Sequence, residues 1–208
     1  YYLCSIMNVL AITSSSHLAN EADRCNLLFE NGLTILHLRK PKFSREEMEG
    51  FIHDISKQFR NRIVIHGHYD LAVKHKLKGV HMRRKHRSDT FRNNLKRWKL
   101  KFRYRKLIFS ATFHSLQSLK ENKVGYQYIL LNNVFSNESK FNFEDSGLKL
   151  IHAIIETTKP LVYAVGGVQQ SDISVIKSAR FAGAGLSSSL IRTEQTPALE
   201  ELQVFSAA

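Results

Sequence analysis

The sequence predicts a single-domain (β/α)8 barrel, the architecture also called a TIM barrel. Short apolar runs alternate with segments of helical periodicity along the 208 residues. This alternation is typical of parallel βαβ units, whose strands are covered on both faces and are therefore apolar throughout. No Pro-rich linker or low-complexity stretch divides the chain, and its length suits one hydrophobic core.

Two strand ends near the C-terminus favour a barrel over other α/β folds. The apolar run Pro160–Val165 stops at Gly166-Gly167, and the run Gly183–Leu186 stops at three serines. Such loops let backbone N–H groups approach a phosphate, and barrels bind phosphate after strands seven and eight. The alternative is a pair of tight turns in another α/β fold.

The remaining elements follow in order from periodicity and capping signals. Gly32 is expected to end the first helix, Ser44 and Glu47 fit a capping box, and Ser115 is a natural N-cap. The expected strands are Val9–Thr13, Leu33–Leu38, Ile63–Ile65, Gly79–Met82, Leu107–Ala111, Tyr126–Leu131, Pro160–Val165 and Gly183–Leu186. The expected helices are Asn20–Asn31, one begun by Ser44, Asp70–Leu77, a basic one from Ser88 or Asp89, one begun by Ser115, Leu148–Thr157 and Ser171–Phe181.

Positive charge is concentrated in one segment. Residues Arg83–Lys106 hold twelve Lys or Arg and one acid, so 12 − 1 gives +11 of the chain's +13. Interleaved aromatic residues such as Trp98 are also found in nucleic-acid-binding segments. Without an RNP, zinc-finger or helix-turn-helix signature, we interpret the segment as a solvated basic helix face beside an anionic ligand, and specific nucleic-acid binding is not expected.

The other compositional signals indicate a cytoplasmic protein. Cys4 and Cys25 have no CxxC or metal spacing and fit free thiols in a reducing compartment. No apolar run approaches the ~20 residues that a membrane span needs, so no membrane partner is expected. Met7 is a candidate translation start, which makes residues 1–6 a short N-terminal extension of a domain over 7–208; a signal peptide is not expected.

Six motifs at the expected strand ends carry a family resemblance. LHLRK, VIHGHYDLA, GVHM, SATFHS, LLNNVFSNESK and AVGG resemble, in this order, the strand ends of the thiamine phosphate synthase/TenI family. The resemblance covers nearly the whole chain from Met7. It implies a (β/α)8 barrel and a phosphorylated thiazole substrate, held by the loops after strands six to eight.

The resemblance also implies roles for particular residues. His114 matches the histidine that TenI-type tautomerases use for proton transfer, and imidazole is a suitable general acid or base. Arg39 is expected to clamp a carboxylate or the pyrimidine side of a ligand. The implied phosphate-binding residues are Lys140, Gly166, Gly167, Ser188 and Ser189, and the implied substrate-binding residues are His37, Arg39, His66 and Thr112.

The chain departs from the synthase pattern at three strand ends. In the Gln-x-Arg-x-Lys motif it has His37 for Gln and Pro41 for Lys. It has His66-Gly67 for the Asn-Asp after strand three, and His86 for the Asp that follows strand four. Those two aspartates hold Mg²⁺ and pyrophosphate in synthases, and Mg²⁺ requires oxygen ligands. We therefore expect no cofactor, with Mg²⁺ required only if the chain is a synthase.

Histidines gather at the ends of strands two to four. Facing imidazoles can bind a transition metal such as Zn²⁺. These histidines have no carboxylate or cysteine companion, so we interpret them as polar pocket lining and expect no metal. They are His37, His66, His68, His81 and His86.

Three hypotheses for function follow. The first is a TenI-like thiazole tautomerase with His114 as the proton carrier. The second is a divergent thiamine-phosphate synthase (thiamine-phosphate diphosphorylase), which joins hydroxymethylpyrimidine diphosphate to the thiazole phosphate. The third is a non-catalytic barrel that binds a phosphate ligand or nucleic acid. The sequence leaves a homodimer open.

Overall fold

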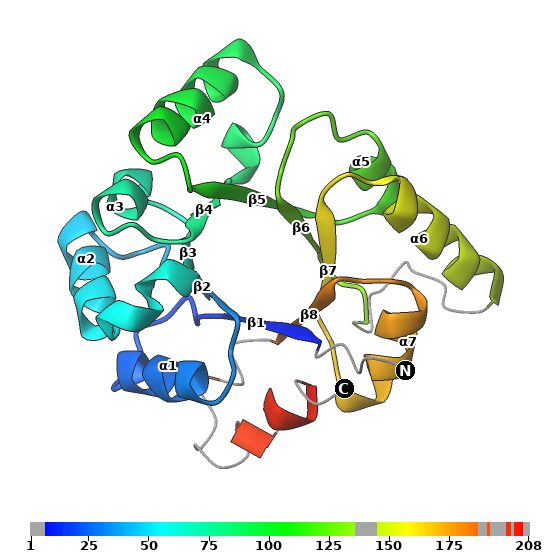
Figure 1. Cartoon of the computed structure of the whole chain (residues 1–208), viewed down its shortest axis with the longest axis horizontal. Helices are drawn as coiled ribbons and strands as arrows, with labels where there is room; N and C mark the ends of the chain where they lie inside the picture. The colour runs from blue at the N-terminus through cyan, green and yellow to red at the C-terminus, as the bar shows by residue number, and fades with distance from the viewer. Residues whose placement is uncertain (1–6, 136–144, 187–190, 192–198, 201, 206–208) are drawn as a thin grey trace.

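The computed structural model is a closed barrel of parallel strands in sequence order, β1 to β8 (Figure 1). The register Asn8↔Gly183 to Ala11↔Leu186 joins β1 to β8 and closes the ring, which confirms the predicted fold class. The structure describes residues 7–135, 145–186, 191, 199–200 and 202–205. The strands are β1 Asn8–Ile12, β2 Ile35–Leu38, β3 Ile63–Ile65, β4 Gly79–His81, β5 Ile108–Phe113, β6 Tyr128–Leu131, β7 Leu161–Val165 and β8 Gly183–Leu186.

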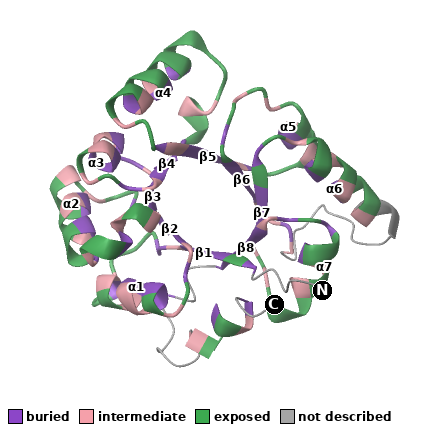
Figure 2. Ribbon diagram, viewed as in Figure 1, coloured by how far each residue is buried: buried purple, intermediate pink, exposed green. Residues whose placement is uncertain are grey.

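Helices form a ring around the barrel, and their buried sides face the strands (Figures 1 and 2). The α-helices are α1 Glu21–Glu30, α2 Arg45–Asp54, α3 Tyr69–Lys74, α4 Phe91–Arg103, α5 Leu116–Lys120, α6 Asp145–Thr157 and α7 Ile173–Ser178. Short 3₁₀ helices are η1 Lys57–Arg62, η2 Arg84–His86 and η3 Gln170–Asp172. No helix in the described part of the chain has the length and apolar character needed to cross a lipid bilayer.

The predicted capping signals are confirmed. The Ser44 side chain accepts a hydrogen bond from the Glu47 amide, and the Glu47 carboxylate accepts one from the Ser44 amide, so both halves of the capping box form. The Ser115 hydroxyl likewise accepts from the Ser118 amide at the start of α5. Each bond satisfies an N–H group that has no partner within its helix.

Several elements differ in length from the prediction by a few residues, and two of these differences have a clear structural reason. Strand β5 extends two residues further, to Phe113, because Thr112 and Phe113 pair with the end of β6. The helix predicted over Ser171–Phe181 is divided into η3 and the shorter α7, which ends at Ser178. Arg180 has φ 58, a left-handed backbone conformation that does not continue a helix.

Helix α4 is turned so that its aromatic side faces solvent. Phe91, Trp98 and Phe102 are 83%, 61% and 74% exposed. The opposite side of the helix buries Arg97 and Asn93, whose side chains donate to the loop before the helix. These hydrogen bonds fix the orientation of α4 and leave an aromatic stripe uncovered.

Candidate active site at the mouth of the barrel

The carboxyl ends of β2, β3 and β4 surround a cavity of about 250 Å³. This is the face on which barrel enzymes carry their active sites. The lining residues are Arg39, Lys40, Pro41, His66 and Arg83. The cavity therefore has two guanidinium groups and an imidazole at its wall.

Three histidines lie together beneath the cavity. His37 Nδ1 is 2.9 Å from His66 Nε2, and the rings of His66 and His81 stack with centroids 4.2 Å apart. His37 is fully buried, so it supports the cavity from below and does not line it. We call His37, His66 and His81 the histidine cluster.

Hydroxyl groups hold the outer sides of the histidine cluster. Tyr128 Oη is 2.7 Å from His37 Nε2. His81 lies between Ser110 and Thr112, with each hydroxyl 2.9 Å from one ring nitrogen. The predicted substrate-binding residue Thr112 thus orients His81, and its half-buried side chain stands below the rim.

Burial keeps the histidine cluster neutral. Desolvation, with the nearby His81, holds the pKa of His37 well below its usual value. The pKa of His66 is lowered in the same way, with further contributions from Arg39 and Arg83. Burial and the charge of Arg39 lower the pKa of His81 to about 3. Near neutral pH each ring therefore carries one N–H donor and one nitrogen lone pair that can accept a hydrogen bond.

The two arginines are positioned by the loops that carry them. The Arg39 amide donates to the Thr13 hydroxyl at 2.8 Å, which fixes the end of β2 against the end of β1. Arg83 Nε donates to the His66 carbonyl at 2.9 Å. A Cβ at Gly67 would lie 2.7 Å from the Arg83 guanidinium, so this glycine makes room for it. Paired guanidinium groups suit a diphosphate or another oxyanion.

Lys40 belongs to the cavity wall, but its ammonium group has a structural role. Its ammonium group pairs with the Glu21 carboxylate and donates to the Ser16 carbonyl at 2.6 Å. The side chains of Lys40 and Glu21 are 0% and 2% exposed. Lys40 is therefore committed to a buried ion pair and does not replace the lysine missing at Pro41.

The predicted catalytic residue His114 lies exposed at the end of β5. Its Nδ1 is 3.3 Å from the side-chain amide nitrogen (Nδ2) of Asn132, the first residue after β6. Asn132 in turn faces the next loop, because a Cβ at Gly166 would lie 3.0 Å from its side-chain oxygen. His114 is thus linked through Asn132 to the predicted phosphate loop.

Gly166 and Gly167 form a tight turn after β7, as the sequence predicts for a phosphate loop. Their φ angles are 86 and 76, in the left-handed region that favours glycine. The Phe135 amide donates to the Gly166 carbonyl at 3.1 Å, which joins the loops after β6 and β7. Lys140, Ser188 and Ser189, the other predicted phosphate-binding residues, lie outside the described residues.

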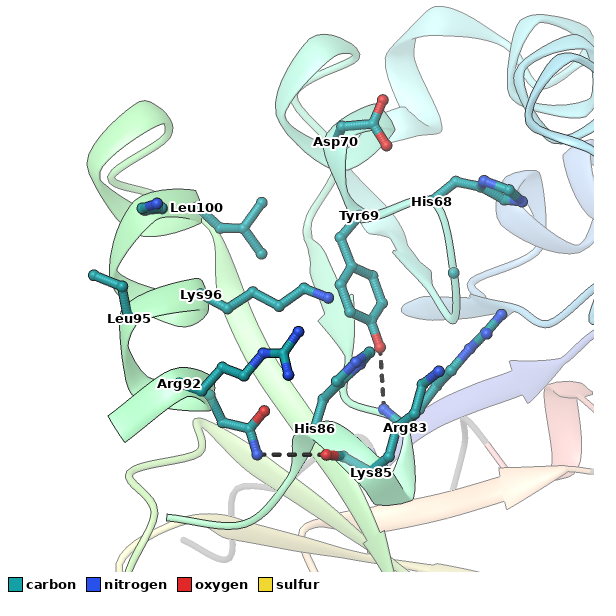
Figure 3. A pocket seen from close by; sticks show the side chains of 13 residues that line it. His68, Tyr69, Asp70, Arg83, Lys85, His86, Arg92, Leu95, Lys96 and Leu100 are labelled. Atoms are coloured by element: carbon teal, nitrogen blue, oxygen red, sulfur yellow. Dashed lines mark hydrogen bonds between the residues drawn. The ribbon is translucent and has the colours of Figure 1, made fainter. Parts of the chain in front are cut away.

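A larger cavity of about 1070 Å³ opens between α3 and α4. Figure 3 shows Lys96 and Arg92 of α4 reaching toward Tyr69 and His86. Burial, together with the charges of Lys85, Arg83 and Arg92, lowers the pKa of Lys96. Converging like charges favour an anionic ligand or counterions here, as the sequence predicts for the basic segment.

Comparison with known proteins decides the family. The family model for thiamine monophosphate synthase (TMP-TENI) matches residues 9–190. The chain belongs to this family. A thiamine-phosphate synthase of Caldivirga maquilingensis is 25% identical over 188 residues, which are 88% of each chain. A putative thiamine-phosphate synthase 2 of Aquifex aeolicus is 25% identical over 165 residues, covering 77% of this chain and 84% of the relative.

Solved structures support the fold of this thiamine monophosphate synthase family member. Thiamine phosphate pyrophosphorylase of Bacteroides thetaiotaomicron superposes with a TM-score of 0.74 at 22% identity, over 96% of this chain and 95% of that one. The Pyrococcus furiosus protein gives 0.73 at 20% identity, over 98% and 95%. These likenesses show the shared barrel.

The Mg²⁺ that the resemblance to synthases implies does not fit the described mouth of this barrel. The positions that this resemblance matches to metal-binding aspartates hold Gly67 and His86. Gly67 offers no side-chain oxygen, and His86 Nδ1 is a buried nitrogen without a hydrogen-bond partner in the described structure. Mg²⁺ prefers oxygen ligands in near-octahedral geometry, so these residues do not form a magnesium site.

Sequence reasoning missed the site roles of Tyr128 and Ser110, and it considered basic residues such as Arg83 for diphosphate binding without including Arg83 among the candidate site residues. Arg83 comes two residues after β4, where a barrel places ligand-binding side chains. Its position along the sequence could therefore have identified it as a site residue. Tyr128 and Ser110 lie inside predicted strands and read as core positions. Only the closed barrel shows that their hydroxyl groups meet histidines from strands far away in the sequence.

Proposed function

We propose that this family member is a thiamine-phosphate synthase that works without a magnesium site of the family type. The observation that carries the proposal is the pair Arg39 and Arg83, which line one cavity at the barrel mouth. His66 lines the same cavity, and Arg83 Nε donates to its carbonyl group. The relatives named thiamine-phosphate synthase support this reaction over the tautomerase that the sequence places first.

The reaction makes one bond and breaks one. The thiazole ring nitrogen attacks the methylene carbon of hydroxymethylpyrimidine diphosphate, and the carbon–oxygen bond breaks as diphosphate leaves with the electron pair. Arg39 and Arg83 stabilise the negative charge that grows on the departing oxygens. Gly166 and Gly167 let the backbone approach the phosphate of the thiazole substrate, which orients its nitrogen.

Activity of purified variants tests the proposal. Thiamine phosphate formation is measured by chromatography from both substrates, with Mg²⁺ and with excess chelator. We expect product in both conditions, and a loss of about 10²–10³ in kcat for Arg39→Gln or Arg83→Gln, the scale for removing one charge-stabilising donor. Arg45→Gln is the matched control, because Arg45 pairs with Asp70 on the outer surface. Absence of product from folded wild-type protein refutes the proposal.

The position of His114 supports thiazole tautomerisation as a second candidate function. Asn132 donates to Nδ1 of the exposed His114 ring, which leaves Nε2–H to exchange protons with a substrate. Deuterium incorporation into thiazole carboxylate phosphate, followed by NMR, measures this activity. His114→Asn should abolish the exchange and Arg83→Gln should preserve it. Exchange that persists in His114→Asn excludes His114 as the proton carrier.

A further inference from the structure

We propose that the histidine cluster is a transition-metal site, with Zn²⁺ as the metal and one nitrogen each from His37, His66 and His81 as ligands. The proposal concerns metal binding and stands independently of the synthase reaction. It departs from our expectation from sequence that these residues are only pocket lining.

The three rings bring their ligand nitrogens close enough together to bind one zinc ion after a local rearrangement. One ligand nitrogen from each ring lies within 4.8 Å of the other two. His37 Nδ1 and His66 Nε2 are 2.9 Å apart, while two nitrogens on a tetrahedral zinc are about 3.3 Å apart for zinc–nitrogen bonds of ~2.0–2.1 Å. Three nitrogens can face one zinc ion if the His37 and His66 rings move slightly apart and the His81 ring turns. This turn breaks the contact between His81 and Thr112.

Two of the three ligands are departures from the motif that the chain otherwise resembles. His37 stands where that motif has Gln, and His66 stands where it has Asn. Either amide can form hydrogen bonds to its neighbours, so a purely structural role does not require imidazole. Both replacements are histidines, and both meet a third histidine in the same cluster. This favours metal binding, a role that imidazole performs and an amide does not.

The outer contacts of the cluster match those of metal-bound histidines. Such rings use their second nitrogen for a hydrogen bond that fixes the orientation and the tautomer. His37 Nε2 contacts the Tyr128 hydroxyl, and His81 Nδ1 contacts the Ser110 hydroxyl. Once His81 Nε2 is released from Thr112, these contacts leave His37 Nδ1 and His81 Nε2 as the ligand atoms. Three neutral nitrogen donors suit Zn²⁺ and Co²⁺ and do not suit Mg²⁺.

The cavity above the cluster gives access and a fourth coordination position. His66 lines this cavity, so a metal ion can enter from the barrel mouth. Arg39 and Arg83 repel a bare cation, and they attract an anion bound to it. We therefore expect an oxyanion, such as inorganic phosphate, as the fourth ligand. Catalytic zinc sites keep such an exchangeable position.

The experiment measures metal binding to the full-length chain without substrates. Protein stripped with chelator is dialysed against Zn²⁺ or Co²⁺, and bound metal is determined by mass spectrometry and by the visible absorption of Co²⁺. We expect one ion per chain and the intense visible bands of four-coordinate Co²⁺, which shift when phosphate is added. His66→Gln should weaken binding at least 100-fold.

A second group of potential ligands on the surface provides the matched control. Glu49, His53 and His75 also bring ligand atoms within 4.8 Å of one another, and Glu49 is paired with Lys74 and His75. His75→Gln should leave the cobalt spectrum unchanged. The proposal is overturned if wild-type protein binds no metal, or if folded His66→Gln binds as wild type does. Loss of the spectrum in His75→Gln would also overturn it, by assigning the metal to the surface group.

Discussion

The buried ion pair between Lys40 and Glu21 allows a quantitative test of the barrel rim. In Lys40→Met the alkyl chain is kept and the ammonium group is lost. The Glu21 carboxylate then stays buried without its cation, and its Oε1 already has no hydrogen-bond partner in the described structure. Removal of one partner from a buried ion pair costs about 3–5 kcal/mol, because the remaining charge is desolvated without compensation.

This cost should be visible in thermal unfolding. For a chain of this size, 1 kcal/mol corresponds to about 2–4 °C in Tm, so Lys40→Met should lower Tm by about 6–20 °C. Differential scanning calorimetry and urea titration at neutral pH measure the change. Replacing both partners, by Lys40→Met with Glu21→Leu, should recover most of the loss, because no buried charge remains.

A second ion pair provides the control. Lys74 pairs with Glu49 at 2.7 Å, but its side chain is 57% exposed. Lys74→Met should lower Tm much less than Lys40→Met does, because water screens the exposed Lys74 ammonium group. If Lys40→Met is as stable as Lys74→Met, the Lys40–Glu21 pair does not hold the rim together and the reasoning is refuted.

Three further predictions follow from features of the loops and surface. Gly166→Ala should cost about 1–3 kcal/mol and weaken thiazole phosphate binding in calorimetric titration, because φ 86 strains alanine; unchanged binding would remove this loop from the site. Hydrogen bonds from Lys74 and His75 lower the pKa of Glu49 to about 2, so the stability that Glu49 contributes is present above about pH 4.5 and lost as pH falls toward 2. Glu49→Gln should flatten this part of the urea-stability profile, and an unchanged profile would contradict the assignment. Binding of RNA to the basic face of α4 should be weak, sequence-independent and absent above about 0.2 M salt in fluorescence anisotropy; salt-resistant binding to one sequence would favour a nucleic-acid function.

Local signals predict much of the fold but do not predict which side chains meet. Apolar runs and capping residues such as Ser44 locate the strands and helix starts, because these depend on neighbours in the sequence. The histidine cluster depends on strand pairing, with His37 beside Val64 and Val64 beside Gly79. No local pattern contains this register. The sequence therefore places histidines at strand ends, and only the closed barrel shows that they converge.

Local patterns also could not predict which side chains of α4 face solvent. The sequence indicates a solvated basic face on this helix, but it does not show that Phe91, Trp98 and Phe102 also face solvent. Hydrogen bonds of Arg97 to the preceding loop favour this orientation. A buried arginine reads from sequence as a surface residue, because no local pattern shows that carbonyl groups of the preceding loop turn toward it.

The exposed aromatic stripe of α4 has a consequence for handling the protein in solution. The +11 balance of residues 83–106 keeps copies of the chain apart at low ionic strength. Salt shortens the screening length from about 10 Å at 0.1 M to about 3 Å at 1 M, while attraction between exposed aromatic rings persists. Sulfate and phosphate strengthen that attraction further. Solubility should therefore fall as salt rises, and the high-salt washes that strip nucleic acid from basic proteins should drive this one to self-associate through α4.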